Sequence, residues 1–138
     1  MIKKVDYCII NRSFWPEYGA IGEGLLLLAE SFASEGKKVI VISATNDLKN
    51  KLKTASRGKN IFFKPLKKID SSNSNLLIRI FSSIIFASWC ATILVIYRPK
   101  MVYVSTDPPI IVPLIVALFC KIFKAKYVYH YQDIQIFQ

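Results

Sequence analysis

The stretch VDYCIINRSFWPEYGAIGEGLLLLAESFASEGKKVIVIS, residues 5–43, decides the fold. Residues 5–10 form a short β-rich run, and residues 39–42 form a continuous apolar run, typical of a strand buried on both faces. Between these runs, apolar residues at helical spacing predict a helix over 22–35: Leu25, Leu28, Ala29 and Phe32. Gly36 stands where a helix C-terminal cap is expected. This β-α-β unit predicts a parallel sheet.

The rest of the chain continues the alternation of strands and helices. We expect further strands over 61–63, 101–104 and 126–131, and further helices over 76–97 and up to about Phe123. A Ser/Asn-rich linker over 70–75 offers helix caps. The predicted fold class is α/β: a Rossmann-like parallel sheet of about five strands with three flanking helices, in one domain over residues 1–138.

The charge of the chain indicates an anionic partner. The formal net charge is +10, and the partner classes that fit it are nucleic acid, an acidic membrane leaflet and a phosphorylated ligand. Eight basic residues and no acidic one lie between 48 and 69, so we expect a basic loop over about 47–70. The residues expected to contact a membrane are Lys49, Lys51, Lys53, Arg57, Lys59, Lys67 and Lys68.

The predicted helix over 76–97 is the most apolar part of the sequence. Residues 80–97 carry no charge, and a run of about 18 residues reaches the lower limit for a transmembrane helix. A membrane span here would separate the strands on either side and destroy the parallel sheet. We therefore favour a crossover helix that also presents an apolar stripe to lipid or to a partner, with a true span as the alternative.

The cysteines and the N-terminus indicate a cytoplasmic location. Cys8, Cys90 and Cys120 lie far apart in apolar runs without metal-ligand spacing, so we expect buried free thiols of a reducing compartment and no metal site. The basic start of the chain is followed by Asp6 and Asn11, which interrupt the apolar segment that a secretory signal requires. The chain is therefore expected in the cytoplasm or on the inner face of the cell membrane.

Four loops qualify as ligand sites, because open parallel sheets bind ligands outside the carboxyl ends of their strands. They cover residues 11–24, 43–46, 105–109 and 130–133. The glycines of the first loop fall in the order G-x-x-G-x-G, which is neither the dinucleotide fingerprint nor a phosphate-binding P-loop. Two interpretations stay open for this loop: a tight turn that allows close helix–sheet packing, or a helix N-terminus that binds an anion.

Three segments together resemble a known enzyme family. They are NRSFWPEYGAIGEGLLLLAESFASEGKKVIVIS at 11–43, MVYVSTDPP at 101–109 and YVYHYQDI at 127–134. In this order and spacing the chain resembles the N-terminal half of family-4 glycosyltransferases of the GT-B type. The subgroup that it is most similar to builds bacterial surface polysaccharides such as O-antigen and capsule.

The resemblance implies a GT-B architecture of two Rossmann-like domains with a cleft between them. In such enzymes the N-terminal domain binds a lipid-linked acceptor and often touches the membrane, and the C-terminal domain binds the nucleotide-sugar donor. The C-terminal donor-binding domain is absent from this sequence, so no cofactor is expected on this chain. The family transfers sugars with retention, but this chain is expected to be inactive alone and to need a donor-binding partner.

The resemblance also suggests the acceptor site. The start of the helix at Gly22 would hold a phosphate or sugar oxygen, and the His-Asp pair common in the family reads Gln132-Asp133 here. Asp107 serves either as a helix cap or as a cleft residue, and no catalytic residue is assigned. The expected acceptor-binding residues are Glu17, Gly19, Gly22, Asp107, His130, Gln132 and Asp133.

Two alternatives from other functional classes remain open. The first is a non-catalytic anchor subunit that recruits a separate donor-binding subunit to the membrane. The second is a basic nucleic-acid-binding domain. The basic segment has no stacking aromatics beyond Phe62 and Phe63, and the sequence has no recognised nucleic-acid motif, which disfavours the second alternative.

Overall fold

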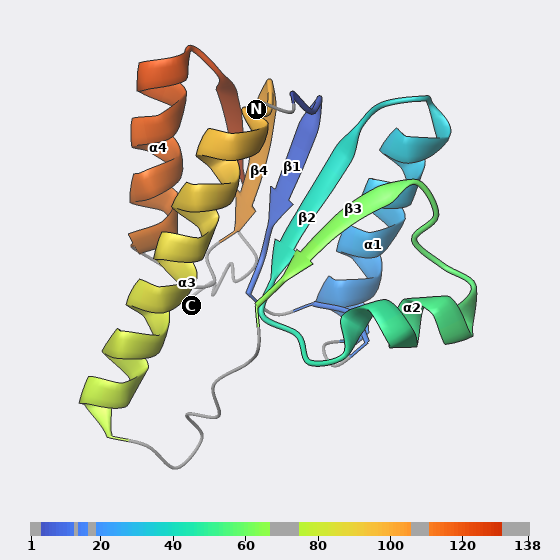
Figure 1. The fold of residues 1–138 in the computed structure, drawn as a ribbon, viewed down its shortest axis with the longest axis horizontal. Coiled ribbons are helices and arrows are strands. Elements are labelled where there is room, and N and C mark those ends of the chain that lie inside the picture. The colour runs from blue at the N-terminus through green and yellow to red at the C-terminus, as the bar shows by residue number, and fades with distance from the viewer. Residues whose placement is uncertain (1–3, 13, 17–18, 67–74, 106–110, 131–138) are drawn as a thin grey trace, which may run out of the picture.

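The computed structural model describes residues 4–12, 14–16, 19–66, 75–105 and 111–130. Five parallel strands form one sheet in the order β3-β2-β1-β4-β5 (Figure 1). The strands are β1 (Tyr7–Ile10), β2 (Val39–Ser43), β3 (Ile61–Pro65), β4 (Met101–Ser105) and β5 (Lys126–His130). The helices are α1 (Gly19–Ser34), α2 (Leu48–Ala55), α3 (Leu76–Tyr97) and α4 (Ile111–Phe123). The expected α/β class with a five-stranded parallel sheet is confirmed.

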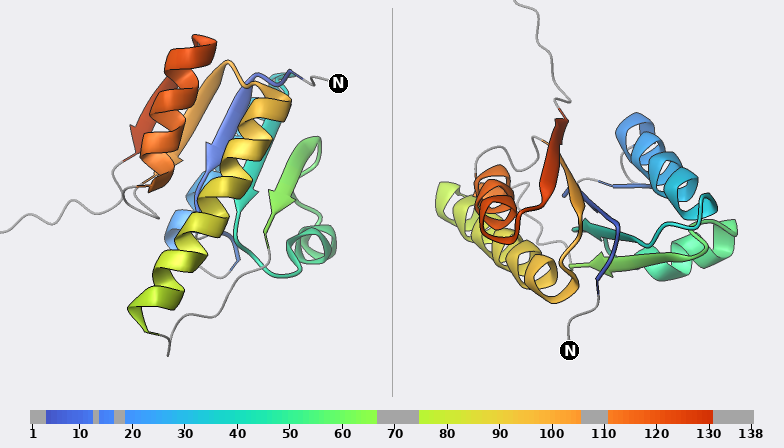
Figure 2. Two further views of the ribbon diagram at one scale, coloured as in Figure 1. Left: turned by 60° about the vertical axis from the view of Figure 1, so that its left-hand side comes forward. Right: turned by 90° about the horizontal axis from the view of Figure 1, so that it is seen from above.

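Helices cover both faces of the sheet, as Figure 2 shows. α1 and α2 lie on one face, and α3 and α4 lie side by side on the other. Because side chains alternate along a strand, Ile9 packs into the core under α1, whereas Cys8 and Ile10 pack into the core under α3 and α4. Both sides of β1 and β2 are therefore buried, which explains their continuous apolar sequences.

The expected basic loop is wrong over residues 48–55, because these residues form α2, and the described part of the chain has four helices instead of three. Leu48 and Leu52, four residues apart, are both buried against the sheet face that α1 covers. Lys49 and Lys53, beside these leucines, are exposed, so α2 is amphipathic. A two-leucine stripe is too short a signal to stand out in a sequence dominated by lysine.

α3 runs over the predicted residues and connects β3 to β4 within the same sheet. Its first turn is capped by Asn75, whose side chain accepts a hydrogen bond from the backbone N–H of Ile78 (3.2 Å). By length and composition it is the one helix in the described residues that could cross a membrane. Phe86, Cys90 and Leu94 are nevertheless buried against the sheet, as the crossover interpretation requires.

The boundaries of the other long helices differ little from expectation. α1 begins at Gly19, three residues before the predicted start at Gly22. Gly36 follows it with a left-handed backbone (φ 81°) and donates its N–H to the carbonyl of Ala33, as expected of a C-terminal cap. α4 ends at Phe123 as predicted. Pro113 lies within its first turn, where the missing N–H costs no helical hydrogen bond.

The three cysteines are free and buried, as expected. All three belong to the core between the sheet and the α3–α4 layer. Burial raises the pKa of the Cys8 thiol well above its ordinary value, and burial likewise raises the pKa of Cys90. These thiols therefore act as small apolar core groups and stay protonated at neutral pH.

Candidate functional site

The strand order places a topological switch point between β1 and β4. The chain runs outward from β1 through β2 to β3, and then crosses back to β4 on the other side of β1. The strands are in register, so Ile10 pairs with both Ile42 and Val104, and all carboxyl ends meet at one edge. A crevice opens at such a point in open α/β sheets, and ligands bind there.

An apolar cavity of about 500 Å³ lies beside this switch point. α1 forms one wall, and β1, β4 and β5 form the other. Gly24 lies on the α1 wall, and a Cβ added to it would meet no atom within 4 Å. The cavity therefore has room for a ligand group next to the helix. Its lining residues are Ile10, Ala20, Ile21, Gly24, Leu25, Leu28, Tyr103, Val104 and Val128.

Gly22 has a packing role in this crevice. A Cβ on Gly22 would lie 2.4 Å from the backbone N of Trp15 and 2.8 Å from the carbonyl C of Phe14. The loop after β1 therefore packs directly on the α1 backbone, with Phe14 buried beneath it and the Trp15–Pro16 peptide bond in cis. The expectation that the helix starts at Gly22 is corrected: α1 starts at Gly19, and its first backbone N–H groups lie one turn earlier.

Arg57, expected to contact a membrane, is half-buried and paired with two glutamates of α1. Its Nη1 donates to both carboxylate oxygens of Glu23 (2.7 and 2.6 Å), and its Nη2 donates to Oε1 of Glu30 (2.6 Å). The guanidinium also lies 5.8 Å from the centre of the Trp15 ring. Its charge is therefore paired between α1, the loop after α2 and the loop after β1.

This ion-pair network shifts the pKa values of Glu30 and Arg57. The hydrogen bond from Arg57 holds the pKa of the Glu30 carboxyl below its ordinary value, and the backbone N–H of Gly58 adds to that effect. The hydrogen bond to Glu30, followed by the one to Glu23, raises the pKa of Arg57. Both groups therefore stay charged over the physiological range.

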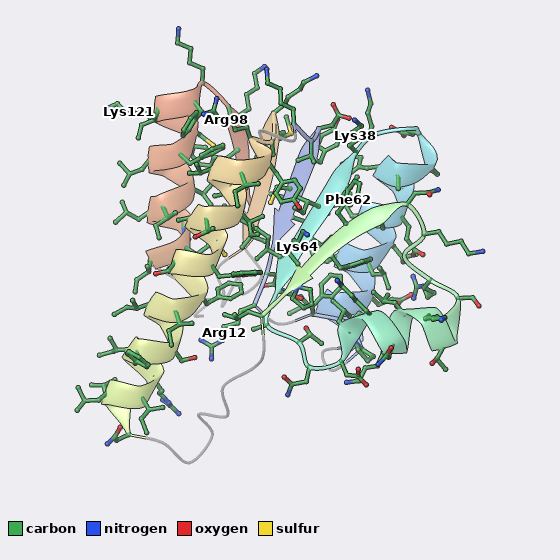
Figure 3. All side chains as sticks on the ribbon, viewed as in Figure 1. Arg12, Lys38, Phe62, Lys64, Arg98 and Lys121 are labelled. Carbon is green, nitrogen blue, oxygen red and sulfur yellow. The ribbon has the colours of Figure 1, made fainter. Side chains whose placement is uncertain are left out.

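Polar groups collect at the carboxyl edge where β1 and β2 end. Asn11, Ser43 and Thr45 are buried there, and Thr45 donates its hydroxyl to the Ser43 hydroxyl at 3.3 Å. Arg12 is half-buried at the same edge, and Figure 3 shows its side chain there. Arg12 was not among the expected site residues. The signal that could have found it is its position two residues after the end of a buried strand.

The remaining expected site residues are only partly described. Gly19 begins α1, and His130 ends β5, where it pairs in register with Ser105 of β4. Their backbones therefore belong to the carboxyl edge. Outside the described residues lie Glu17, Asp107, Gln132, Asp133, Lys67 and Lys68.

The other expected membrane residues lie on or after α2. Lys49, Lys53 and Lys59 are exposed, and Lys51 is half-buried. α2 packs on the sheet face opposite to α3 and α4, so these lysines and the apolar helix α3 belong to different faces. Within the described residues, no group of three His, Cys, Asp or Glu side chains could hold a metal ion.

Comparisons with known proteins identify the fold. No protein-family model matches the sequence, and no curated protein matches it. A solved glycosyltransferase from Rickettsia africae superposes with a TM-score of 0.57 at 18% identity, over 91% of this chain and 29% of that one. The C-terminal domain of a hydrogenase from Pyrococcus furiosus superposes with a TM-score of 0.58 at 13% identity, over 94% and 93%.

The fold is Rossmann-like. At these identities the similarity establishes the fold alone, and it is shared by a glycosyltransferase and by a hydrogenase domain. The chain spans less than a third of the glycosyltransferase that it matches. The functional conclusion must therefore come from the site.

Proposed function

We propose that this chain is the acceptor-binding half of a glycosyltransferase. The enzyme would transfer a sugar from a nucleotide-sugar to a lipid-linked saccharide during surface polysaccharide synthesis. The proposal is supported by three motifs, at 11–43, 101–109 and 127–134, that resemble GT-B enzymes of family 4. It is also supported by a Rossmann-like fold that matches part of a solved glycosyltransferase.

The observation that carries the proposal is the apolar cavity beside the switch point. Ligand sites are concave and mostly apolar, with a few polar groups at the rim. Here the cavity wall is the start of α1, and the buried Asn11 and half-buried Arg12 lie at the end of β1 on the same edge of the sheet. An acceptor with an apolar chain or sugar face and a phosphate group matches this combination.

Each part of the crevice has a role in this proposal. The apolar wall would bind the lipid-proximal part of the acceptor. Arg12 and the first N–H groups of α1, from Gly19 onward, would bind an acceptor phosphate, because guanidinium groups and helix N-termini both favour anions. The proposed cleft residues outside the described part are Glu17, Asp107, Gln132 and Asp133. Together these groups would position the acceptor hydroxyl toward a donor held elsewhere.

The donor would be bound by a second Rossmann-like domain, on a longer form of the chain or on a separate subunit. This chain then contributes orientation, not chemistry. Positioning of this kind contributes much of the rate enhancement in group transfer, because it converts an encounter between two substrates into a reaction within one complex.

Filling the cavity tests the proposal. In Gly24→Leu the new side chain has open space and enters the cavity, and leucine is a better helix former than glycine, so folding should not suffer. We expect this variant to bind a polyprenyl diphosphate monosaccharide in detergent about tenfold more weakly than the wild type, measured by isothermal titration calorimetry.

Gly24→Ala is the matched control, because one methyl group leaves most of the cavity open. It should bind the probe like the wild type. Equal binding by Gly24→Leu, with the fold intact by circular dichroism, would remove the cavity from the acceptor site. When the variants are mixed with a donor-binding domain, Gly24→Leu should lose sugar transfer and Gly24→Ala should keep it.

A further inference from the structure

The outer surface of the α3–α4 layer is strongly apolar. Sixteen large apolar side chains are exposed among the described residues, and eleven of them belong to these two helices. We call this surface the α3–α4 outer face. Its members are Leu76, Leu77, Ile78, Ile80, Phe81, Ile84, Val95, Ile96, Leu114, Leu118 and Ile122.

Two exposed hydroxyl groups on these helices are already hydrogen-bonded and need no water. α3 carries no charged residue after Arg79, and neither α3 nor α4 contains an acidic residue. Two exposed hydroxyls bond to the carbonyls of their own helix: Ser88 donates to Ile84 and Thr92 donates to Ser88, each at 2.9 Å. Hydroxyls satisfied in this way can be placed against hydrocarbon without leaving an unpaired polar group.

The first turns of α3 favour lipid over a protein groove as the occupant. α3 extends beyond the carboxyl edge of the sheet (Figures 1 and 2). Every residue from Leu76 to Phe81 is exposed, so its apolar side chains point around the whole circumference. A fluid bilayer can surround these protruding first turns while the rest of α3 lies in its surface, whereas a protein groove covers one stripe of a helix. Arg79 is the one charge among them, and its long side chain can reach a lipid headgroup.

Cations stand at both ends of the apolar surface. Arg79 is exposed at the start of α3, and Lys121 and Lys124 are exposed where α4 ends, as Figure 3 shows for Lys121. An apolar helix face flanked by cations is the pattern of helices that lie in the surface of a bilayer containing anionic lipids.

We propose that the α3–α4 outer face docks this protein on the surface of an anionic bilayer, with both helices parallel to the membrane plane. The exposed apolar side chains would enter the headgroup–acyl boundary, and the flanking cations would contact lipid phosphates. α3 does not cross the bilayer, because Phe86, Cys90 and Leu94 stay packed against the sheet. The lysines of α2 face away from the membrane. The inference does not depend on the proposed function.

A matched pair of leucines provides the test. Leu118 is 52% exposed on α4, and Leu27 is 53% exposed on α1, across the sheet. The full chain and its Leu118→Glu and Leu27→Glu variants are sedimented with vesicles of equal parts phosphatidylcholine and phosphatidylglycerol. We expect Leu118→Glu to weaken partitioning about tenfold, because an inserted apolar group becomes an anion. Leu27→Glu should bind like the wild type or only slightly less.

Pure phosphatidylcholine vesicles and high salt should weaken binding of the wild type about tenfold, because the lipid charge is removed or screened. Equal binding by Leu118→Glu and the wild type, or equal loss in both variants, would overturn the proposal. The proposal would also be overturned if the wild type did not bind vesicles but formed a dimer in lipid-free solution, and if Leu118→Glu dissociated that dimer. Should Leu118→Glu misfold, Ile122→Gln, at a 69% exposed position of the same face, replaces it.

Discussion

Gly22 and Gly24 lie two residues apart in α1, yet their surroundings differ. A Cβ on Gly22 would collide with the backbone of Trp15, whereas a Cβ on Gly24 would enter open space beside the switch point. The order of the glycines in the sequence excluded a dinucleotide fingerprint. The glycine order could not show that Gly22 is needed for packing and that Gly24 borders a cavity. This difference depends on which part of the folded chain lies next to each glycine.

Gly22→Ala should destabilise the protein. The added methyl group cannot be accommodated without moving the loop after β1, and overpacking of this kind costs about 1–3 kcal/mol. Gly24→Ala should instead raise the free energy of unfolding by about 0.5–1 kcal/mol, because alanine is the better helix former. Urea denaturation of both variants measures the difference. A Gly22→Ala protein as stable as the wild type would refute the close contact with Trp15.

At the scale of elements, the basic segment contains a helix, α2, that the sequence pattern did not predict. Its lysines predicted a loop, yet Leu48 and Leu52 bury one face of α2, and Arg57 ties the segment to α1. By contrast, the bounds of α3 were predicted correctly, because a long apolar run between Asn75 and Arg98-Pro99, with Arg79 as its one charged residue, leaves few alternatives. Long periodic segments can be predicted from sequence, whereas short ones depend on the surface that they meet.

The ion pair between Arg57 and Glu30 should make stability depend on pH. The pKa of Glu30 is lower in the folded protein than in the unfolded chain, so its contribution is present above the unfolded pKa of about 4.3. It is lost as the pH falls through the folded pKa. Glu30→Gln should therefore cost about 1–2 kcal/mol at pH 7 and much less in acid.

Urea denaturation of the wild type and Glu30→Gln at neutral and acidic pH measures this dependence. Glu35→Gln removes an exposed carboxylate just after the same helix and serves as the control. It should leave the free energy of unfolding nearly unchanged at both pH values. A constant difference between the wild type and Glu30→Gln across the pH range would contradict the proposed ionic role of Glu30.

At the scale of the whole molecule, the two sides of the sheet have different surfaces. The α1–α2 side is closed by an ion-pair network and exposes lysines, whereas the α3–α4 side exposes apolar residues. Composition alone suggested that basic and apolar segments could act together on a membrane. The topology puts α2 and α3 on opposite faces of the sheet. The reason is that strands are added toward one edge up to β3 and toward the other edge from β4 on.

The buried thiols report on the integrity of this fold. Cys8, Cys90 and Cys120 share the core under α3 and α4, so thiol reagents should not react with them in the native protein. All three should react together when the protein unfolds in urea. Ellman's reagent gives the measurement. Rapid reaction of a thiol in the folded protein would mean that the α3–α4 layer opens independently of the sheet.

The sequence by itself determined the α/β class, the five strands and three of the four helices, because hydrophobic periodicity and glycine or proline punctuation are local properties. It also marked the loops at the carboxyl ends as candidate sites. Only the tertiary structure decided which groups meet: Gly22 with Trp15, Arg57 with Glu23 and Glu30, and Gly24 with the cavity. These contacts join residues brought together by packing, which no local pattern encodes.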